Sequence, residues 1–259
     1  GLLQFFYGPI GDRFGKYHTL VIATLCCVVS NLFVVFAPSF EWVLVGRFLS
    51  GGTAAAIVPL SMAWIGDHVA YESRQATLAQ FMIGTILGTS AGLVLGGLFT
   101  DTTGWRGAFV FLAALYLLVG LWLLSQRRHV TEHNAGVSGR LRIGAPIKAV
   151  LGTPWARVVL FVVLIEGAMV FGGLSFVPAY LQQHHGLSSS TAGLVTSLFG
   201  LGALFYVLGA RWLVSRFSEA KLVMMGGWLL GICYVVYLAT DHWYYAILAR
   251  MGFGLGYYL

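Results

Sequence analysis

Two arginines and one glutamate lie inside long apolar stretches of this sequence of 259 residues. Arg47 and Arg250 each occupy such a stretch, and Glu166 is the only carboxylate well inside one. A charged side chain inside an apolar helix is costly and is kept mainly where it lines a polar cavity or meets a partner. A carboxyl group in that environment favours its protonated form until water or a cation reaches it, as proton exchange requires. The three residues therefore predict a site for protons or for a polar part of a solute.

Each of these residues also has a plainer interpretation. Arg47 lies about five residues from one end of its stretch, roughly 8 Å deep at about 1.5 Å per residue, so its side chain could extend to a membrane surface. Glu166 lies about eleven residues into the stretch 155–183, near the middle, and could be a protonated residue that hydrogen-bonds another helix. We favour the functional interpretation for both, and Arg250 repeats the position of Arg47.

The composition is that of an integral membrane protein. Hydrophobic residues make up 58% of the chain and charged residues only 9%, whereas soluble domains average about 25% charged residues. The mean hydropathy is +0.83. Cys26, Cys27 and Cys233 all lie in apolar stretches, so a disulfide framework is not indicated. The net charge of +6 falls on the connections between apolar stretches, which argues against binding to nucleic acid.

Eight apolar stretches are long enough to cross a bilayer, for which about 20 residues suffice. They cover 18–37, 42–66, 74–100, 105–126, 155–183, 190–214, 219–240 and 243–259, and residues 1–9 resemble the end of an earlier span. The polar and basic segment 127–154 is the one clear linker.

Basic residues gather on one side when these spans are threaded alternately. That side holds Arg13, Lys16, Arg74, Arg127, Arg128, Arg140, Arg142, Lys148, Arg157, Arg211, Arg216 and Lys221. The opposite side holds Arg106 alone, together with Glu41, Asp101 and Asp241. Because cytoplasmic loops carry an excess of lysine and arginine, we expect the basic side and the linker to be cytoplasmic.

An internal repeat appears when the chain is shifted by 203 positions. Arg13-Phe14 then aligns with Arg216-Phe217, Arg47 with Arg250, and Gly51 with Gly254. The offset spans six membrane crossings, an even number, so both copies have the same orientation. Parallel six-span repeats joined by a linker are one known arrangement of secondary transporters.

The string GPIGDRFGK, residues 8–16, resembles the signature turn between the second and third helices of the major facilitator superfamily. Gly8, Asp12, Arg13 and Gly15 match that turn, and Lys16 is a conservative match. The resemblance implies that this cluster acts as a conformational latch on the cytoplasmic side and stabilises one of two access states.

Two further strings support the same resemblance. RFLSGGT, which begins at Arg47, resembles the fourth-helix motif of the superfamily. GTSAGLVLGG, residues 88–97, resembles the antiporter motif of the fifth helix, although Leu93 stands where proline is usual. Within it Gly88, Gly92 and Gly96 recur every fourth residue, as does Gly84 before them, and with Gly97 they are expected to allow another helix to pack closely.

The resemblance implies an all-α, polytopic membrane protein with the major facilitator fold of two six-helix bundles. We expect an N-terminal bundle at 1–126, a cytoplasmic linker at 127–154 and a C-terminal bundle at 155–259. The chain would then run from the end of helix 2 into helix 10, with roughly 50 residues missing before it and roughly 70 after it by comparison with the full repeat.

The implied function is proton-coupled efflux of a small, hydrophobic compound by alternating access. Glu166, Arg47 and Arg250 are the expected proton-coupling or cavity residues. A proton-coupled uptake symporter or a uniporter of the same fold stays open as an alternative, as does a receptor or sensor that does not transport.

No catalytic constellation is visible in the sequence, so we do not expect an enzyme. No cofactor is expected, and the adjacent His184 and His185 are interpreted as loop residues rather than metal ligands. The expected partners are a small-molecule substrate, protons and the lipid bilayer, without nucleic acid. The expected state is a monomer in a bacterial inner membrane.

Overall fold

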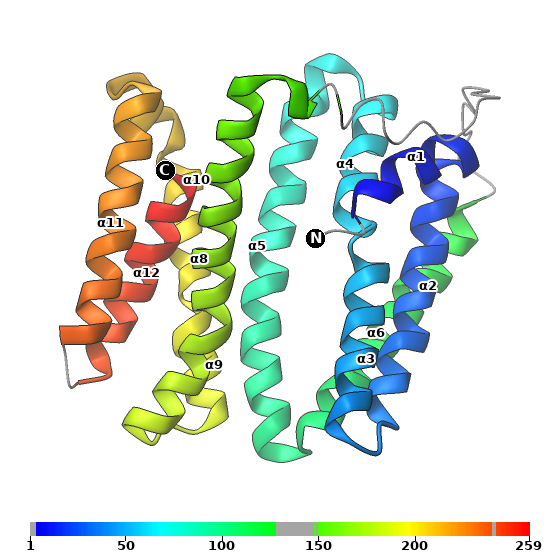
Figure 1. Cartoon of the computed structure of the whole chain (residues 1–259), viewed down its shortest axis with the longest axis horizontal. Helices are drawn as coiled ribbons and strands as arrows, with labels where there is room; N and C mark the ends of the chain where they lie inside the picture. The colour runs from blue at the N-terminus through cyan, green and yellow to red at the C-terminus, as the bar shows by residue number, and fades with distance from the viewer. Residues whose placement is uncertain (1–3, 128–147, 149, 240–241) are drawn as a thin grey trace. The chain divides into compact units, whose positions relative to one another are not determined.

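The computed structural model describes residues 4–127, 148, 150–239 and 242–259, and in these ranges the chain is helical. Its helices in chain order are α1 (Gln4–Phe14), α2 (Lys16–Val35), α3 (Phe40–Ala54), α4 (Ile57–His68), α5 (Tyr71–Thr102), α6 (Trp105–Gln126), α8 (Pro154–His185), α9 (Ser189–Ser197), α10 (Phe199–Arg216), α11 (Glu219–Ala239) and α12 (Tyr244–Tyr258). The helical fold expected from the sequence is confirmed (Figure 1).

Seven spans among the described residues are long and apolar enough to cross a membrane. They correspond to α2, α3 with α4, α5, α6, α8, α9 with α10, and α11. The stretch predicted at 243–259 forms α12, whose 15 residues are shorter than a full crossing. The protein is therefore a multi-pass membrane protein.

Two of the predicted spans are interrupted by a tightened turn. Between α3 and α4 the Ala56 N–H bonds the Thr53 carbonyl, and Pro59 has no N–H to offer the Ala55 carbonyl. Between α9 and α10 the Leu198 N–H bonds the Val195 carbonyl in the same i→i+3 pattern. Each span is thus made of two helices, a detail that hydropathy cannot show.

The chain divides into two compact units, one formed by residues 1–79 and 105–160 and the other by residues 80–104 and 161–259. In the first unit α2 is central, and it packs against α1, α3, α4 and α6. The Tyr17 hydroxyl donates to the Leu123 carbonyl of α6 at 2.7 Å, and the Tyr7 hydroxyl donates to the Gly52 carbonyl of α3 at 2.8 Å. Tyrosine hydroxyls thus join helices through backbone carbonyls inside an apolar unit.

In the second unit α12 is central and packs against α10 and α11 (Figure 1). A Cβ at Gly202 of α10 would meet the Met251 carbonyl, and a Cβ at Gly254 of α12 would meet the Phe199 carbonyl. These two glycines let the backbones of α10 and α12 touch. Apolar clusters around Phe253 and Leu181 complete the packing. The predicted boundary between bundles at 127–154 falls mostly on residues outside the described ranges and stays a prediction.

Candidate functional site

The charged turn predicted from residues 8–16 is made by a single residue, Gly15, between α1 and α2. Its φ of 91° lies in the left-handed region that glycine adopts without strain. The Gly15 carbonyl accepts hydrogen bonds from the Thr19 N–H and hydroxyl, at 3.0 and 2.8 Å. Gly8 lies inside α1, where a Cβ would meet no atom within 4 Å. Of the two motif glycines, Gly15 is therefore the one that the backbone requires here.

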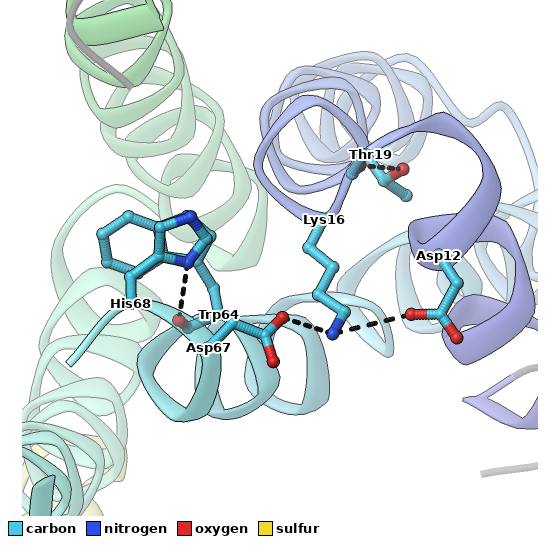
Figure 2. A network of polar contacts seen from close by, with 7 residues as sticks. Asp12, Lys16, Thr19, Trp64, Asp67 and His68 are labelled. Atoms are coloured by element: carbon cyan, nitrogen blue, oxygen red, sulfur yellow. Dashed lines mark hydrogen bonds and ion pairs between the residues drawn. The ribbon is translucent and has the colours of Figure 1, made fainter. Parts of the chain in front are cut away.

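Lys16 lies between two carboxylates from different helices (Figure 2). Its Nζ is 2.5 Å from Asp67 Oδ2 and 3.5 Å from Asp12 Oδ1. The Lys16 side chain is 24% exposed, against 49% for Asp67 and 57% for Asp12, so the cation is the most shielded member. Arg13 is exposed, and its Cζ lies 5.3 Å from the centre of the Phe14 ring. The predicted latch residues Asp12 and Lys16 are thus brought together, with Asp67 as a third member.

Helix dipoles explain why these charges pair. Asp67 lies in the last turn of α4, where the partial negative charge of the helix disfavours a carboxylate, and Lys16 begins α2, where the dipole disfavours a cation. Pairing the two offsets both unfavourable positions. The turn is also held by packing, because a Cβ at Gly11 of α1 would lie 2.6 Å from Leu60 Cδ2 of α4. Trp64 and His68 stack beside Asp67 with ring centres 4.6 Å apart (Figure 2).

Asp67 was missing from the predicted site. It lies 51 residues from Lys16 and belongs to none of the strings that resemble the superfamily motifs. Its position at the end of a predicted span was the one available signal, because an acid on the side that carries most of the basic residues is a natural counterion for them.

Arg47 and Arg106, both in the first unit, have different surroundings. Arg47 of α3 is exposed, with its Cζ 5.5 Å from the centre of the Phe109 ring of α6. Arg106 at the start of α6 donates from Nε to the Val35 carbonyl and from Nη2 to the Ala37 carbonyl, both at 3.1 Å. Arg106 therefore caps the C-terminal end of α2, a position that favours a cation. No ion pair with a carboxylate is found for Arg47 in the described ranges.

Arg250 of α12 is fully buried, unlike its repeat partner Arg47. In the described part of the chain none of its three guanidinium nitrogens has an acceptor in good hydrogen-bond geometry. Its Cζ lies 4.8 Å from the centre of the Phe253 ring, and the Tyr234 and Tyr237 side chains interact with it electrostatically. Both hydroxyls donate elsewhere, to the Met169 and Ala246 carbonyls, which leaves their oxygen lone pairs as local negative charge. A cation in such a place is costly without an anionic partner.

Glu166 lies on α8 with its side chain exposed. Twelve residues separate it from the start of α8, or about 18 Å along the helix axis. Its charge interacts with the Tyr257 hydroxyl of α12, and Tyr257 packs against the apolar cluster that contains Phe253. No ion pair between Glu166 and Arg250 is found among the described residues.

The glycine-rich part of α5 makes a close backbone contact through Gly97, one of the four glycines predicted to pack against another helix. A Cβ at Gly88, Gly92 or Gly96 would meet no atom within 4 Å, whereas one at Gly97 would meet the Ser189 carbonyl of α9. A Cβ at Gly193 of α9 would meet the Leu93 carbonyl in turn. Successive residues point about 100° apart around a helix, so the contact at 93 and 97 is displaced from the face of the four-residue repeat. For Gly88, Gly92 and Gly96, helix packing stays a prediction.

An apolar hollow of about 360 Å³ is lined by α1, α2 and Thr53 of α3. Its walls include Tyr7, Phe14 and Cys26, and none of the three predicted proton-coupling residues lines it. His184 and His185 end α8 rather than lying in a loop, with ring centres 4.7 and 5.7 Å from that of Tyr180. Within the described ranges no group of three metal-ligating side chains is found.

Known proteins resemble this chain over most of its length. It is 27% identical over 204 residues to the uncharacterized MFS-type transporter YwfA of Bacillus subtilis, covering 78% of this chain and 50% of that protein. It is 28% identical over 277 residues to the multidrug transporter MdfA of Edwardsiella piscicida, covering 98% and 64%. The crystal structure of a D-xylose-proton symporter shares the fold, with a TM-score of 0.64 at 16% identity, covering 99% of this chain and 66% of that one. The chain thus spans about half to two thirds of the length of these proteins.

The family model described as Major Facilitator Superfamily matches residues 1–259, the whole of the chain. That match agrees with the multi-pass helical fold and with the assembled charged turn between α1 and α2. This chain belongs to the major facilitator superfamily.

Proposed function

We propose that this chain is the central part of a proton-coupled exporter of small, hydrophobic compounds that works by alternating access. Membership of the major facilitator superfamily supports secondary transport of a small molecule as the activity of the whole protein. Export rather than import, the proton as the coupling ion and the hydrophobic substrate are our proposals. Similarity to a protein named as a multidrug transporter supports them, as does the antiporter-like string of residues 88–97.

The observation that carries the mechanism is the bridge from Lys16 to Asp12 and Asp67. It joins α1, α2 and α4. The basic residues Arg13 and Arg74 lie at the same end of the first unit. Because basic loops are cytoplasmic, we place this cluster on the cytoplasmic side of a bacterial inner membrane, with the linker 127–154. There it stabilises one access state through charges that must rearrange when the other state forms. A sensor that does not transport has no need for such a latch.

Proton coupling is assigned to Glu166, with Arg47 and Arg250 as the cations that favour its ionised form or attract the substrate. Glu166 lies near the middle of α8, and its charge reaches the Tyr257 hydroxyl. A carboxyl group that meets water on one side of the membrane in one access state and on the other side in the next can carry a proton across. This alternation is what exchange of a substrate for a proton requires. We propose a monomer as the transporting unit.

A second function of the same fold is proton-coupled uptake. Leu93 replaces the proline usual in the antiporter string, and the fold is shared with a D-xylose-proton symporter. Export and uptake differ in the direction in which protons move when the substrate moves. That direction can be measured.

The test uses the full-length protein in proteoliposomes with a pH-sensitive dye in the lumen. A panel of hydrophobic compounds is added outside without an imposed gradient. An antiporter moves protons opposite to the compound, so the lumen becomes more acidic on substrate efflux and more alkaline on influx. Proton movement in the same direction as the compound would support uptake by symport instead. Compound movement without any change in the dye signal would identify a uniporter.

The same assay tests the assignment of Glu166. The neutral Glu166→Gln variant should bind and exchange compound but lose substrate-driven proton movement by about tenfold or more, the size expected of an essential proton carrier. Glu72→Gln is the matched control, because Glu72 is an exposed carboxylate in the first turn of α5. Proton movement by Glu166→Gln at the wild-type rate from pH 6 to 8 would place the coupling residue elsewhere.

A further inference from the structure

Asp101, near the C-terminal end of α5, accepts three hydrogen bonds from the first turn of α9. Its Oδ2 accepts from the Ser190 N–H at 2.7 Å and from the Ser190 hydroxyl at 2.6 Å, and its Oδ1 accepts from the Ser189 N–H at 3.2 Å. Asp101 and Ser190 lie 89 positions apart in the sequence. None of the superfamily motifs discussed above assigns a role to Asp101.

The first N–H groups of α9 are satisfied by Asp101 and by Ser188 together. A helix leaves the N–H groups of its first turn without partners inside the helix. Asp101 accepts from Ser189 and Ser190, and the Ser188 hydroxyl accepts from the Thr191 N–H at 3.2 Å. The Ser189 hydroxyl donates to Gln182 of α8 at 3.1 Å. A carboxylate from another helix thus completes the cap of α9, where the helix dipole favours a negative charge.

The contact lies at the end of a tightly packed helix pair. On α5, Ile86, Ser90, Leu93, Gly97 and Asp101 follow one another at three- or four-residue spacing and so share a face. Ile86 is 1% exposed, and a Cβ at Gly200 of α10 would meet the Ser90 hydroxyl. Gly97 and Gly193 bring the α5 and α9 backbones into contact just before Asp101. Since these backbones touch, a separation of α5 from α9 must break the bonds of Asp101.

We propose that Asp101 and the first turn of α9 form an outer lock that holds one access state and opens in the other. The proposal rests on the alternating-access function argued above. Basic-loop asymmetry places Asp101 on the side opposite the Lys16 cluster, because one span, α5, separates the 67–73 turn from the 101–104 turn. The lock is then a positioning device for the transport cycle, with Asp101 as its acceptor and Ser189 and Ser190 as its donors.

The test measures the separation of α5 from α9, and it needs no known substrate. Thr102→Cys on α5 and Leu194→Cys on α9, both exposed positions, carry spin labels in the full-length protein from which other reactive cysteines are removed. Double electron–electron resonance then gives the distribution of distances between the two labels. Asp101→Asn keeps one acceptor oxygen and loses the charge, so the long-distance population should rise about two- to fivefold, as expected from one exposed charged contact. Ser190→Ala, which removes one of the three bonds, should give a smaller shift.

Glu41→Gln is the matched control. Glu41 is a carboxylate predicted to lie on the same side of the membrane as Asp101, but it accepts a hydrogen bond from Ser39 at the start of its own helix α3. This variant should leave the distance distribution unchanged. An unchanged distribution in Asp101→Asn, or an equal change in Glu41→Gln, would overturn the lock.

A second variant keeps the proposal testable if Asp101→Asn fails to fold. The pair Asp101→Cys and Ser190→Cys can be joined by oxidation, which should abolish compound movement in proteoliposomes, and a reductant should restore it. Full compound movement by the oxidised pair would show that transport does not require this contact to open, and would overturn the lock. If no variant or wild-type protein moves any compound while the distance shift is present, the proposed transport function fails and the lock stands.

Discussion

At the scale of single residues, two arginines that the internal repeat makes equivalent differ in how far their side chains are buried. The internal repeat predicts that Arg47 and Arg250 share one geometry, yet Arg47 is exposed and Arg250 is fully buried. The reason lies in their neighbours. The Arg250 guanidinium lies over the Phe253 ring and interacts electrostatically with Tyr234 and Tyr237 of α11, whereas the exposed Arg47 lies over the Phe109 ring of α6. The repeat therefore predicts the position of a residue along its helix, but it does not predict which side chains surround that residue.

The Arg250→Met variant tests whether the buried charge lowers the stability of the protein while it serves transport. Replacing an unpaired buried cation with an apolar side chain of similar length removes a desolvation penalty, so the variant should keep or raise the thermal stability of the full-length protein in detergent. Transport should fall, because the cation that favours an ionised carboxylate or binds substrate is gone. Arg47→Met, at an exposed position, is the matched control for stability. A loss of about 3–5 kcal/mol in Arg250→Met would show that Arg250 has a structural ion-pair partner in the whole protein.

At the scale of helices, the sequence predicts the residue range of α5 better than it predicts which face of α5 packs against another helix. Gly88, Gly92, Gly96 and Gly97 were all expected to pack, and the observed contact uses Gly97 and the carbonyl of Leu93, whereas a Cβ at any of the other three would meet no atom within 4 Å. Periodicity identifies which residues share a face and cannot say which face meets a partner. The same limit applies to Asp67 and Asp101, whose partners are 51 and 89 residues away. Local features such as Gly15, where a positive φ is required, were open to prediction from the motif.

Two glycine substitutions test the packing of α5 directly. Gly97→Ala should lower the thermal stability of the full-length protein, because its Cβ would meet the Ser189 backbone carbonyl, which cannot move without moving α9. Gly92→Ala should be neutral or stabilising by about 0.5–1 kcal/mol, since alanine is the better helix former and space is free at that position. Thermal unfolding of both variants in the same detergent gives the comparison. Equal stability of the two variants would contradict the observed α5–α9 contact.

At the scale of the whole molecule, hydropathy and charge asymmetry predict the membrane spans, because the bilayer imposes length and composition on every crossing helix. They do not show the breaks between α3 and α4 or between α9 and α10, which depend on single turns of backbone. Nor do they show which charges meet. The proposed cycle uses two sets of polar contacts, the Lys16 cluster and the Asp101 cap, which the charge asymmetry of the loops predicts to lie on opposite sides of the membrane. Alternating access requires that the two ends open at different times.

The most direct test of this account is the accessibility of the two ends to a membrane-impermeant thiol reagent. Single cysteines near the Lys16 cluster and near Asp101 are placed in the full-length protein in sealed right-side-out and inside-out vesicles. Asp67→Asn, which removes the shortest ion pair of Lys16, should raise labelling near the Lys16 cluster and lower it near Asp101, by about two- to fivefold each. Asp12→Asn should act in the same direction and less strongly, and Glu72→Gln should leave both rates unchanged. Labelling that stays at the wild-type level at both ends in Asp67→Asn, with transport intact, would contradict the latch and with it this account of alternating access.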